Sequence, residues 1–307
     1  MFVSTYDIGG KGVRTLGIPV DPDEIIGQNF PTPIICETRK WKQVKEFIGD
    51  TYNHDANAIS LGVAGMNKKN DLMVISPNFP QLNGKYVATE IDKITGKPVK
   101  VFNDMTVTAY GVLPYYPGEP CFMVITWSSG IGLRILINGK IVSECEAGHM
   151  TLDLSIFAQI CGCKRRGHVE AMISGDVIKK MVQAETQALG IKIPKAVHPN
   201  ACMDMAYGQG EAWARILYEY IGQVMGIFLA NIKTIFPELS LIVWKGRVAK
   251  ERLSVLEKDI RLTMQSRLIK GIEADEESLR FEMTPAPEDI DSLTGAAVAY
   301  KVHSQPS

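Results

Sequence analysis

The chain has 307 residues, which predicts about two domains, and 46% of them are hydrophobic, which is enough for two cores. Its 33 basic and 34 acidic residues give a net charge of -1 without a basic tail or stripe, so nucleic acid and anionic membranes are not expected partners. Six cysteines in so long a chain do not indicate a disulfide scaffold. The sequence contains no run of 18 apolar residues, so no membrane span is predicted. At the N-terminus, no basic segment precedes an apolar run. We therefore expect no signal peptide and a reducing, cytoplasmic location.

The N-terminal residues predict two strands joined by a tight glycine turn, FVSTYDIGG followed by GVRTLGIPV. Asp7 falls at the end of the first strand. Gly9 and Gly10 would let backbone N–H groups approach a phosphate, since glycine carries no side chain to prevent it. The residues alone favour a plain hairpin over such a phosphate loop.

Alternating helical and extended patterns follow in the first third of the chain. Residues 33–39 are predicted as a strand and residues 40–52 as an amphipathic helix. The apolar run AISLGVAG ends in small residues, which is typical of a buried strand that delivers a loop to a site. In the later segment SPNFPQLNG, Asn78 fits either a turn cap or a ligand contact.

Asn103 and Asp104 stand between a predicted strand, PVKVF, and a helix-like segment, TVTAYGVL. Such a pair usually caps the helix by accepting hydrogen bonds from its first N–H groups, and the residues alone favour that interpretation. A helix N-terminus also favours the ionised form of a carboxylate, so Asp104 would remain a proton acceptor at neutral pH.

The segment YYPGEP, residues 115–120, contains two prolines and a glycine and predicts a domain boundary. A second copy of the first pattern follows it, with an apolar strand, the turn SSGIG and a hairpin whose tip is Asn138-Gly139. Residues from about 207 to 236 are predicted as one long helix for core or dimer packing, and SLIVWKG as another buried strand.

Residues 146–170, EAGHMTLDLSIFAQICGCKRRGHVE, gather metal-binding side chains within a short segment. His149, Cys161, Cys163 and His168 supply the two imidazoles and two thiolates of a closed tetrahedral zinc site. The alternative is a set of surface histidines and buried thiols, which are common in proteins of reducing compartments. Four soft ligands seldom cluster in this way without a metal, so we favour zinc.

This segment resembles the signature of the ROK family of sugar kinases, repressors and open reading frames, usually E-x-G-H followed by C-x-C-G-x-x-G-C-x-E. Lys164 replaces a family glycine, and His168 replaces the third cysteine with another residue that binds zinc. The resemblance extends from Asp7 to Ala297. The signature residues that the chain keeps are Glu146, Gly148, His149, Cys161, Cys163, Gly167 and Glu170.

The resemblance implies an α/β fold of two ribonuclease-H-like domains, of the actin and hexokinase ATPase type, with a cleft between them. The N-terminal domain would be residues 1–116, with a C-terminal helix at about 287–302 that packs back on it. Residues 117–286 would form the C-terminal domain with the zinc segment and the long helices. Dimers are common in the family, so a homodimer is expected.

The resemblance also implies a carbohydrate kinase that transfers a phosphoryl group from ATP, with Mg²⁺, to a hexose or N-acetylhexosamine, at the 6-hydroxyl. Asp104 would be the general base, and the zinc would be structural. The residues expected to bind the sugar are Asn78, Asn103, Asp104, Glu146, His149 and Glu170. Those expected to bind the phosphates and nucleotide are Asp7, Gly9, Gly10, Lys11, Ser129, Gly130, Gly132 and Gly246.

The chain departs from the family pattern chiefly in the nucleotide loops. Ser128 and Ser129 replace Gly-Thr, and Trp244 and Lys245 occupy two of three glycine positions that end at Gly246. One explanation is that Trp244 stacks on the base while Lys245 contacts phosphate. The other is that ATP binding is impaired or that another phosphoryl donor is used. The alternative function is therefore a non-catalytic sugar-binding or regulatory homologue, or a kinase with a donor other than ATP.

Overall fold

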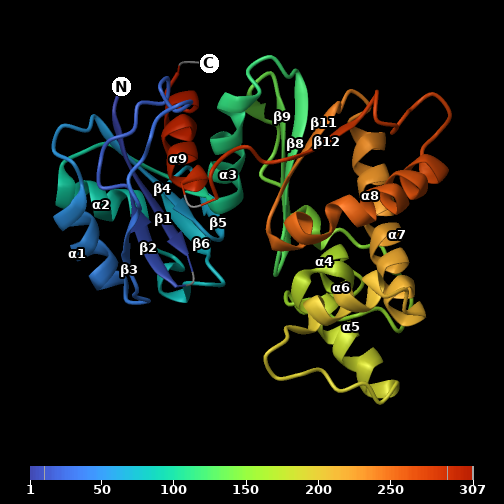
Figure 1. Cartoon of the computed structure of the whole chain (residues 1–307). Coiled ribbons are helices and arrows are strands. Elements are labelled where there is room, and N and C mark those ends of the chain that lie inside the picture. Colours follow the sequence, from blue (N-terminus) through green and yellow to red (C-terminus); the bar gives the residue numbers. More distant parts are fainter. Residues whose placement is uncertain (10, 289, 306–307) are drawn as a thin grey trace. The chain divides into compact units, whose positions relative to one another are not determined.

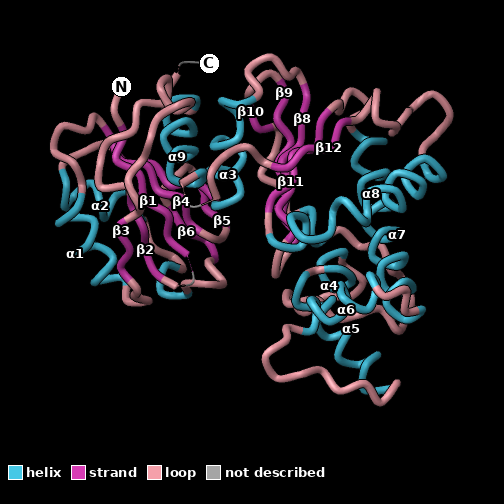
Figure 2. The backbone as a smooth tube through the Cα atoms, viewed as in Figure 1, coloured by secondary structure: helices cyan, strands magenta, loops and turns pink. Residues whose placement is uncertain are grey.

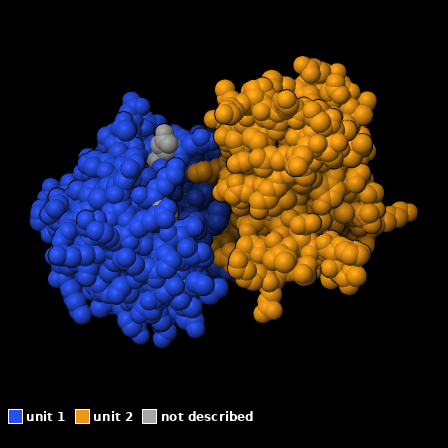
Figure 3. Space-filling model, turned by 90° about the horizontal axis from the view of Figure 1, so that it is seen from below, with its two compact units in different colours: residues 1–120, 136–144, 284–307 blue, residues 121–135, 145–283 orange. Residues whose placement is uncertain are grey.

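The structure, a computed structural model, describes residues 1–9, 11–288 and 290–305 (Figure 1). Gly10, one of the expected phosphate-binding residues, lies outside the described residues. The chain divides into two compact units (Figure 3). Unit 1 comprises Met1–Pro120, Leu136–Glu144 and Thr284–Ser307, and unit 2 comprises Cys121–Ile135 and Cys145–Met283. Leu136–Glu144, which we expected in the C-terminal domain, thus groups with unit 1.

A five-stranded sheet forms the centre of unit 1, in the order β3-β2-β1-β4-β7. Strands β1, β4 and β7 run parallel, and the register pairs Ile8 with Val63 and Val63 with Asn103. Because parallel strands in register end at the same edge, the residues that follow these strands lie close together. The strands are β1 (Val3–Gly9), β2 (Gly12–Thr15), β3 (Ile34–Cys36), β4 (Ala58–Val63) and β7 (Val99–Asn103).

Helices cover both faces of this sheet (Figure 1). Helices α1 (Trp41–Thr51) and α2 (Val87–Thr95) share a buried core with alternate residues of β1 and β4. Helices α3 (Asp104–Val112) and α9 (Asp291–Val302) pack on each other and on the opposite face. The remaining elements of unit 1 are β5 (Met66–Lys68), β6 (Leu72–Ile75), η1 (Pro80–Leu82) and η2 (Leu113–Tyr115).

The second sheet repeats the strand order of the first, as β10-β9-β8-β11-β12. The predicted hairpin tip is confirmed, because Asn138 and Gly139 take the positive φ values of 49° and 74° that a two-residue type I′ turn requires. The strands are β8 (Cys121–Trp127), β9 (Ile131–Ile137), β10 (Lys140–Ile141), β11 (Leu241–Lys245) and β12 (Arg280–Met283).

Most of unit 2 outside the sheet is helical (Figure 2). The long helix predicted at about 207–236 is found as α7 (Ala212–Ile235). Its first residues belong instead to the end of α6 and to a turn in which Gly210 takes φ 81°. No helix among the described residues is both long and apolar enough to cross a membrane. The helices are η3 (Ala147–His149), α4 (Val169–Ile173), α5 (Gly175–Ala188), α6 (Pro199–Gly208), α7 (Ala212–Ile235) and α8 (Arg247–Arg267).

Candidate functional site

Asp104 begins helix α3 directly after strand β7, and Asn103 caps that helix. The Asn103 Oδ1 accepts a hydrogen bond from the Met105 N–H at 2.8 Å, and its Nδ2 donates to the Gly65 carbonyl at 2.8 Å. The Asn103 amide therefore fastens the start of α3 to the loop that follows β4. The half-buried Asp104 carboxylate stands at the positive end of the helix.

Two further loops meet at the same edge of the unit 1 sheet. Gly65 has φ 131°, and a Cβ there would lie 2.2 Å from the Ile75 carbonyl oxygen, so only glycine fits this approach. The Ser76 hydroxyl donates to the Ala64 carbonyl at 2.7 Å, which holds the next loop against the end of β4. Asn78 is exposed on that loop. The edge thus gathers the loops that carry Asp104 and Asn78.

Asp7, an expected phosphate-binding residue, already has two partners on its carboxylate. Its Oδ2 accepts hydrogen bonds from the Arg14 guanidinium at 2.8 Å and from the Ser292 hydroxyl of α9 at 3.0 Å. Lys11 is exposed in the turn that follows, and a Cβ placed on Gly9 would meet no atom within 4 Å. Neither Arg14 nor Ser292 could be identified from the sequence, because the contacts of Asp7 with these residues form only in the folded chain.

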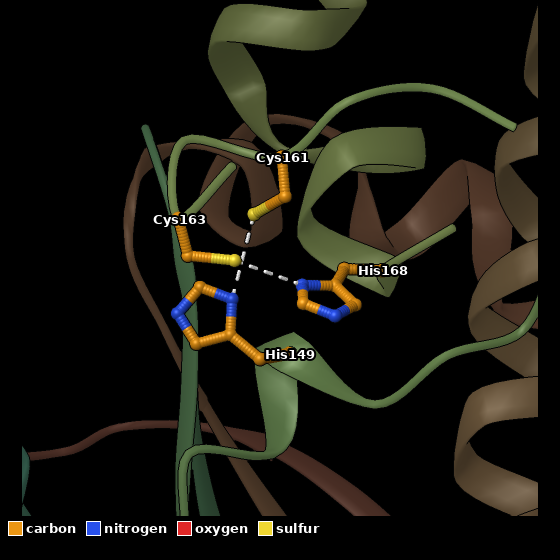
Figure 4. Close-up of side chains that lie close together, drawn as sticks. All are labelled: His149, Cys161, Cys163 and His168. Atoms are coloured by element: carbon orange, nitrogen blue, oxygen red, sulfur yellow. Dashed lines mark hydrogen bonds between the residues drawn. The ribbon is translucent and has the colours of Figure 1, made fainter. Parts of the chain in front are cut away.

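His149, Cys161, Cys163 and His168 come together in unit 2 (Figure 4). Their ligand atoms all lie within 4.8 Å of one another. The Cys161 Sγ lies 3.4 Å from the His149 Nδ1, and the Cys163 Sγ lies 3.3 Å from the His168 Nδ1. Tetrahedral zinc with bonds of about 2.0–2.3 Å would place neighbouring nitrogen and sulfur ligands roughly 3.6 Å apart, so this donor set fits the ion.

The backbone of this segment is folded around the four side chains. The Cys161 N–H donates to the Arg165 carbonyl at 2.7 Å and closes the turn between the cysteines and His168. Lys164 in this turn takes φ 69°, a left-handed conformation that glycine adopts without strain. This explains the glycine usual at that position, and lysine there costs roughly 1–2 kcal/mol.

Burial and the nearby acidic groups, Cys163 and Glu170, raise the pKa of the Cys161 thiol. Without a cation, Cys161 would thus resist becoming a thiolate. A divalent metal reverses this preference, because a coordinating thiol loses its proton to the ion's charge.

Glu170, the last residue of the segment 146–170 that carries the proposed metal ligands, binds the turn after β8. Its Oε2 accepts a hydrogen bond from the Ile131 N–H at 3.0 Å, while its Oε1 lies 3.8 Å from the Cys161 Sγ. A Cβ on Gly130 would lie 2.7 Å from the Oε2, so glycine leaves room for the carboxylate. Glu146 is exposed, and its carbonyl accepts from the His149 N–H at 2.9 Å.

A cavity of about 180 Å³ opens in unit 2 where several helices begin, beside the turn after β8. The Gly175 N–H, at the start of α5, donates to the Ser128 carbonyl at 2.7 Å. Helices α6 and α8 also begin here, and helix N-termini favour anions because their N–H groups point outward. The lining residues are Ser128, Ser129, Gly175, Asp176, His198, Asn200, Arg247, Val248, Glu251 and Arg252.

Several residues that line this cavity were not predicted from the sequence, although two of the helix starts beside it have recognisable sequence patterns. Pro199 at the first position of α6 is a typical helix start, as is the Gly246-Arg247 step after a buried strand. Gly246 takes φ 96°, and a Cβ there would lie 2.6 Å from the Trp127 carbonyl oxygen. Of the expected nucleotide residues, Ser129 lines the cavity, and Gly246 directly precedes the lining residue Arg247.

The hypothesis that Trp244 stacks on a nucleotide base is wrong. Its side chain is 0% exposed, and its ring lies against those of Trp127 and Phe281, with centroids 6.0 and 5.5 Å away. Strand β11 continues through Lys245, so two of the three positions that are usually glycine belong here to a strand. Only Gly246 forms the turn.

The sequence profile of the ROK family matches residues 20–302. The chain belongs to the ROK family. The N-acetylmannosamine kinase of Vibrio vulnificus is 30% identical over 195 residues, which are 60% of this chain and 65% of that enzyme, so the match spans just under two thirds of that relative. The N-acetylmannosamine kinase of Vibrio cholerae is 26% identical over 308 residues, covering 96% of this chain and 98% of that enzyme.

The expected fold is also confirmed. A ROK family glucokinase from Streptomyces griseus, solved in complex with glucose and AMPPNP, superposes with a TM-score of 0.71 at 21% identity, over 97% of this chain and 98% of that one. The duplicated strand order of this ROK chain is therefore that of the hexokinase-like ATPase fold.

Proposed function

We propose that this ROK protein is a sugar kinase that transfers a phosphoryl group from ATP to a hydroxyl of a hexose or N-acetylhexosamine, at the 6-position. The observation that carries the proposal is the match to N-acetylmannosamine kinase along almost the whole chain. The position of Asp104 at a helix start on the carboxyl edge of the unit 1 sheet supports it.

Asp104 is proposed as the general base. As the sugar hydroxyl oxygen forms its bond to the terminal phosphorus, its proton passes to the Asp104 carboxylate, and the bond to the departing ADP oxygen breaks. A sugar hydroxyl is too weak an acid to attack efficiently without such help, which typically contributes about 10²–10⁴-fold. Asn103 is proposed to hold this carboxylate in place, because both ends of its amide are bonded to the backbone.

Glu146, His149, Glu170 and Asn78 are proposed to bind the other sugar hydroxyls, as the ROK family pattern implies. Carboxylate oxygens accept hydrogen bonds from neighbouring hydroxyl groups. The His149 Nδ1 faces Cys161, so its Nε2 would remain available for a hydroxyl. A metal bound through the Nδ1 would fix the tautomer and orientation of this ring.

We propose structural zinc at His149, Cys161, Cys163 and His168. Four protein ligands leave no open position for water, so the ion would brace the segment without taking part in the transfer. None of the six cysteines, all of which are described, forms a disulfide, and we propose a cytoplasmic, reducing location.

The phosphoryl donor is proposed to be ATP with Mg²⁺, whose positive charge neutralises the transferring group. The three helix N-termini around the 180 Å³ cavity suit the donor's negative charge, while Arg247 on its lining is paired with Glu251 at 2.6 Å. The residues proposed to bind the phosphates and the nucleotide are Asp7, Gly9, Gly10, Lys11, Ser129, Gly130, Gly132 and Gly246.

The test is an assay of ADP release with ATP and a panel of glucose, mannose, N-acetylglucosamine and N-acetylmannosamine. We expect turnover of at least one sugar and its 6-phosphate as product, identified by mass spectrometry and NMR. If a sugar stabilises the protein thermally but neither ATP nor any other donor supports turnover, the proposal of a sugar kinase is refuted.

A second candidate is a kinase with another donor, or a homologue that binds sugar without catalysis. It is favoured by the continuation of β11 through Lys245, which leaves Gly246 alone in the turn. Inorganic polyphosphate in the same assay distinguishes these cases. Turnover with polyphosphate alone would identify a different donor, and the assignment of Asp104 would still stand.

A further inference from the structure

A second cavity, of about 650 Å³, opens on unit 1. All of its lining residues belong to that unit, and none of them is among the residues proposed to bind sugar, phosphate or metal. Sites for small molecules usually measure about 300–1,000 Å³, so this cavity has the size of a binding site. We name it the linker cavity, because residues 116–120 of the proline-rich linker form one of its walls.

Helices α3 and α9, which pack side by side, run from the proposed catalytic residues to the linker cavity (Figure 1). Helix α3 begins at Asp104, and its last residue, Val112, directly precedes the lining residue Leu113. Helix α9 begins where Ser292 donates to the Asp7 carboxylate, and its last turn lines the cavity. Since a helix rises by about 1.5 Å per residue, the cavity lies roughly 12 Å from Asp104 along α3.

The walls of the linker cavity are apolar and rigid. Ile25 and Ile26, in the loop after β2, and Val298 of α9 supply apolar surface, and Ile26 is 59% exposed. The Asn138 N–H donates to the Pro120 carbonyl at 2.8 Å, which holds the linker against the tip of the hairpin. Because proline fixes its own φ, a wall rich in proline loses little freedom when a ligand binds. The prolines on the lining are Pro22, Pro114, Pro117 and Pro120.

The charges around the linker cavity favour a cation. Its lining carries two carboxylates, Asp23 and Glu119, and one ammonium group, that of Lys301. Lys301 is paired with Asp23, so one negative charge is in excess. Helix α9 ends at Val302 on the cavity wall, and the negative end of a helix also favours positive charge. Tyr116 adds an aromatic ring, a group whose face attracts cations.

We propose that the linker cavity binds a small amphipathic organic cation, a protonated amine on an aromatic or aliphatic body. The apolar walls cover the body of this ligand, and the ammonium group faces Glu119 and the end of α9. An inorganic cation would leave the apolar walls in contact with water, and an anion would be repelled by the excess negative charge. Because the ligand contacts the linker and α9 together, it also holds α9 in its docked position on α3.

The test is a titration of the full chain with phenethylamine, which is protonated at neutral pH, followed by ligand-observed NMR. We expect a dissociation constant of about 1 mM, as is usual for a ligand of this size. Two probes of similar shape vary the charge, neutral phenethyl alcohol and the anion hydrocinnamate. The amine should bind about fivefold more tightly than the alcohol, since a single exposed ion pair contributes little more, and the anion should bind most weakly.

Two variants locate the amine. Glu119→Gln removes the carboxylate but keeps the shape of the side chain, so the amine should bind about fivefold more weakly while the alcohol is unaffected. Ile26→Ser removes an exposed apolar side chain, so both probes should bind several-fold more weakly. The matched controls are Glu46→Gln on α1 and Ile94→Ser on α2, which change an exposed carboxylate and an exposed apolar side chain outside the cavity. Circular dichroism establishes that each variant is folded.

Hydrogen exchange reports the position of the amine independently. A ligand that binds only when α9 is docked reduces the undocked population by the factor 1 + [L]/Kd, which is about tenfold at about 10 mM amine. Peptides from α9 should therefore exchange about tenfold more slowly in the presence of phenethylamine. Peptides from α7, in unit 2, should exchange at an unchanged rate.

Four outcomes would overturn the proposal. They are an amine that does not bind, an alcohol that binds as tightly as the amine, folded Glu119→Gln and Ile26→Ser variants that bind the amine as well as their controls do, and unchanged exchange of α9 with the amine bound. None of these measurements depends on sugar phosphorylation, so they test the linker cavity separately from the proposed function.

Discussion

At the scale of single residues, the position of Asp104 depends on the preceding residue, Asn103, which few other side chains could replace. The Asn103 amide donates at one end and accepts at the other, so only a side chain with both functions spans the gap between α3 and Gly65. The N-cap and the proposed general base are thus two adjacent residues with different duties. The residues alone favoured the first duty, and the resemblance to the ROK family implied the second.

Replacing the carboxylate tests the second duty. Asp104→Asn keeps the size of the side chain but cannot take a proton, so kcat should fall by about 10²–10⁴-fold while the KM for sugar changes only several-fold. Steady-state kinetics measure both. Asp71→Asn is the control, because Asp71 also accepts a hydrogen bond near a helix start, from the Thr89 N–H at 3.0 Å. A kcat within twofold of wild type in Asp104→Asn would remove Asp104 as the base.

Tyr6 in strand β1 makes unit 1 sensitive to high pH. Burial raises the pKa of Tyr6 to about 12, although its hydroxyl lies 3.2 Å from the Thr51 hydroxyl. In the unfolded chain a tyrosine ionises near pH 10, at about its usual pKa. Between pH 10 and 12 only the unfolded state therefore loses this proton, so stability present below pH 10 decreases as the pH rises.

Tyr6→Phe should remove this part of the pH dependence. The decrease in unfolding free energy from pH 9 to pH 11 should be smaller in the variant by about 1 kcal/mol, since one unit of pKa corresponds to about 1.4 kcal/mol. Urea unfolding at the two pH values gives the difference. Tyr86→Phe, at an exposed tyrosine, should behave as wild type. An unchanged decrease in Tyr6→Phe would show that the phenol ionises equally in both states.

The roles of residues could be predicted where the spacing of residue types along the sequence is enough to define them. The four proposed metal ligands lie within twenty residues of sequence, and the structure gathers them as the pattern suggested. Trp244 was misjudged because its role depends on the length of β11, whose register places Trp244 between Ile125 and Met283 in the sheet. Arg14 and Ser292, which hold Asp7, left no local signal.

At the scale of elements, residues 146–170, which carry the four proposed metal ligands, are mostly loop, with the short η3, isolated bridges and the first residues of α4. Gly167 takes φ 73°, and a Cβ there would lie 1.9 Å from the Asp153 carbonyl oxygen, so the chain closes tightly at this point. The exposed Leu154 and Phe157 add nothing to its own core. A bound ion is thus the main source of stability that the segment can gain.

Metal analysis and one substitution test this view. We expect one zinc per chain by mass spectrometry. Cys161→Ser should lose most of it and lower the melting temperature by several degrees, because removing a structural ligand costs on the order of several kcal/mol. Cys202→Ser, at a free cysteine of α6, should keep both values. A metal-free wild-type protein that melts at the same temperature with and without added zinc would contradict the site.

Helices and strands were predicted well where a local residue pattern defines them, and less well where their ends depend on contacts with distant segments. The helix at 40–52 is found as Trp41–Thr51, whereas the strand at 33–39 shrinks to Ile34–Cys36 because only these residues reach β2. Helix α8 was not foreseen, although Val248, Leu253, Leu256, Ile260 and Met264 are buried at helical spacing. The charged residues between them obscured that period.

At the scale of the whole molecule, the chain leaves unit 1 and returns to it twice. The segment Leu136–Glu144 returns because it contacts α3, where the Glu144 carboxylate accepts from the Thr106 hydroxyl at 3.0 Å. The C-terminal segment returns because α9 packs on the same helix. A domain boundary predicted at the proline-rich linker could not assign Leu136–Glu144 to unit 1, because that assignment depends on a contact between residues far apart in the sequence.

The pairing of α9 with α3 requires glycine where the helices cross. A Cβ on Gly295 would lie 1.8 Å from the Val107 carbonyl oxygen, and one on Gly111 would lie 2.0 Å from the Asp291 carbonyl oxygen. The two backbones therefore touch without side chains between them. Because α3 begins with Asp104 and α9 holds Asp7 through Ser292, this crossing fixes two proposed site residues at once.

Gly295→Val should force the helices apart and destabilise unit 1 by about 3 kcal/mol, since a close-packed interior cannot absorb added methyl groups. Urea unfolding, followed by hydrogen exchange on peptides from each unit, should show earlier opening of α3 and α9 while α7 is unchanged. Gly118→Val is the control, because a Cβ there meets no atom within 4 Å. Equal stability of the two variants would show that α9 docks on α3 loosely, and the C-terminal helix would then have no part in placing Asp7 or Asp104.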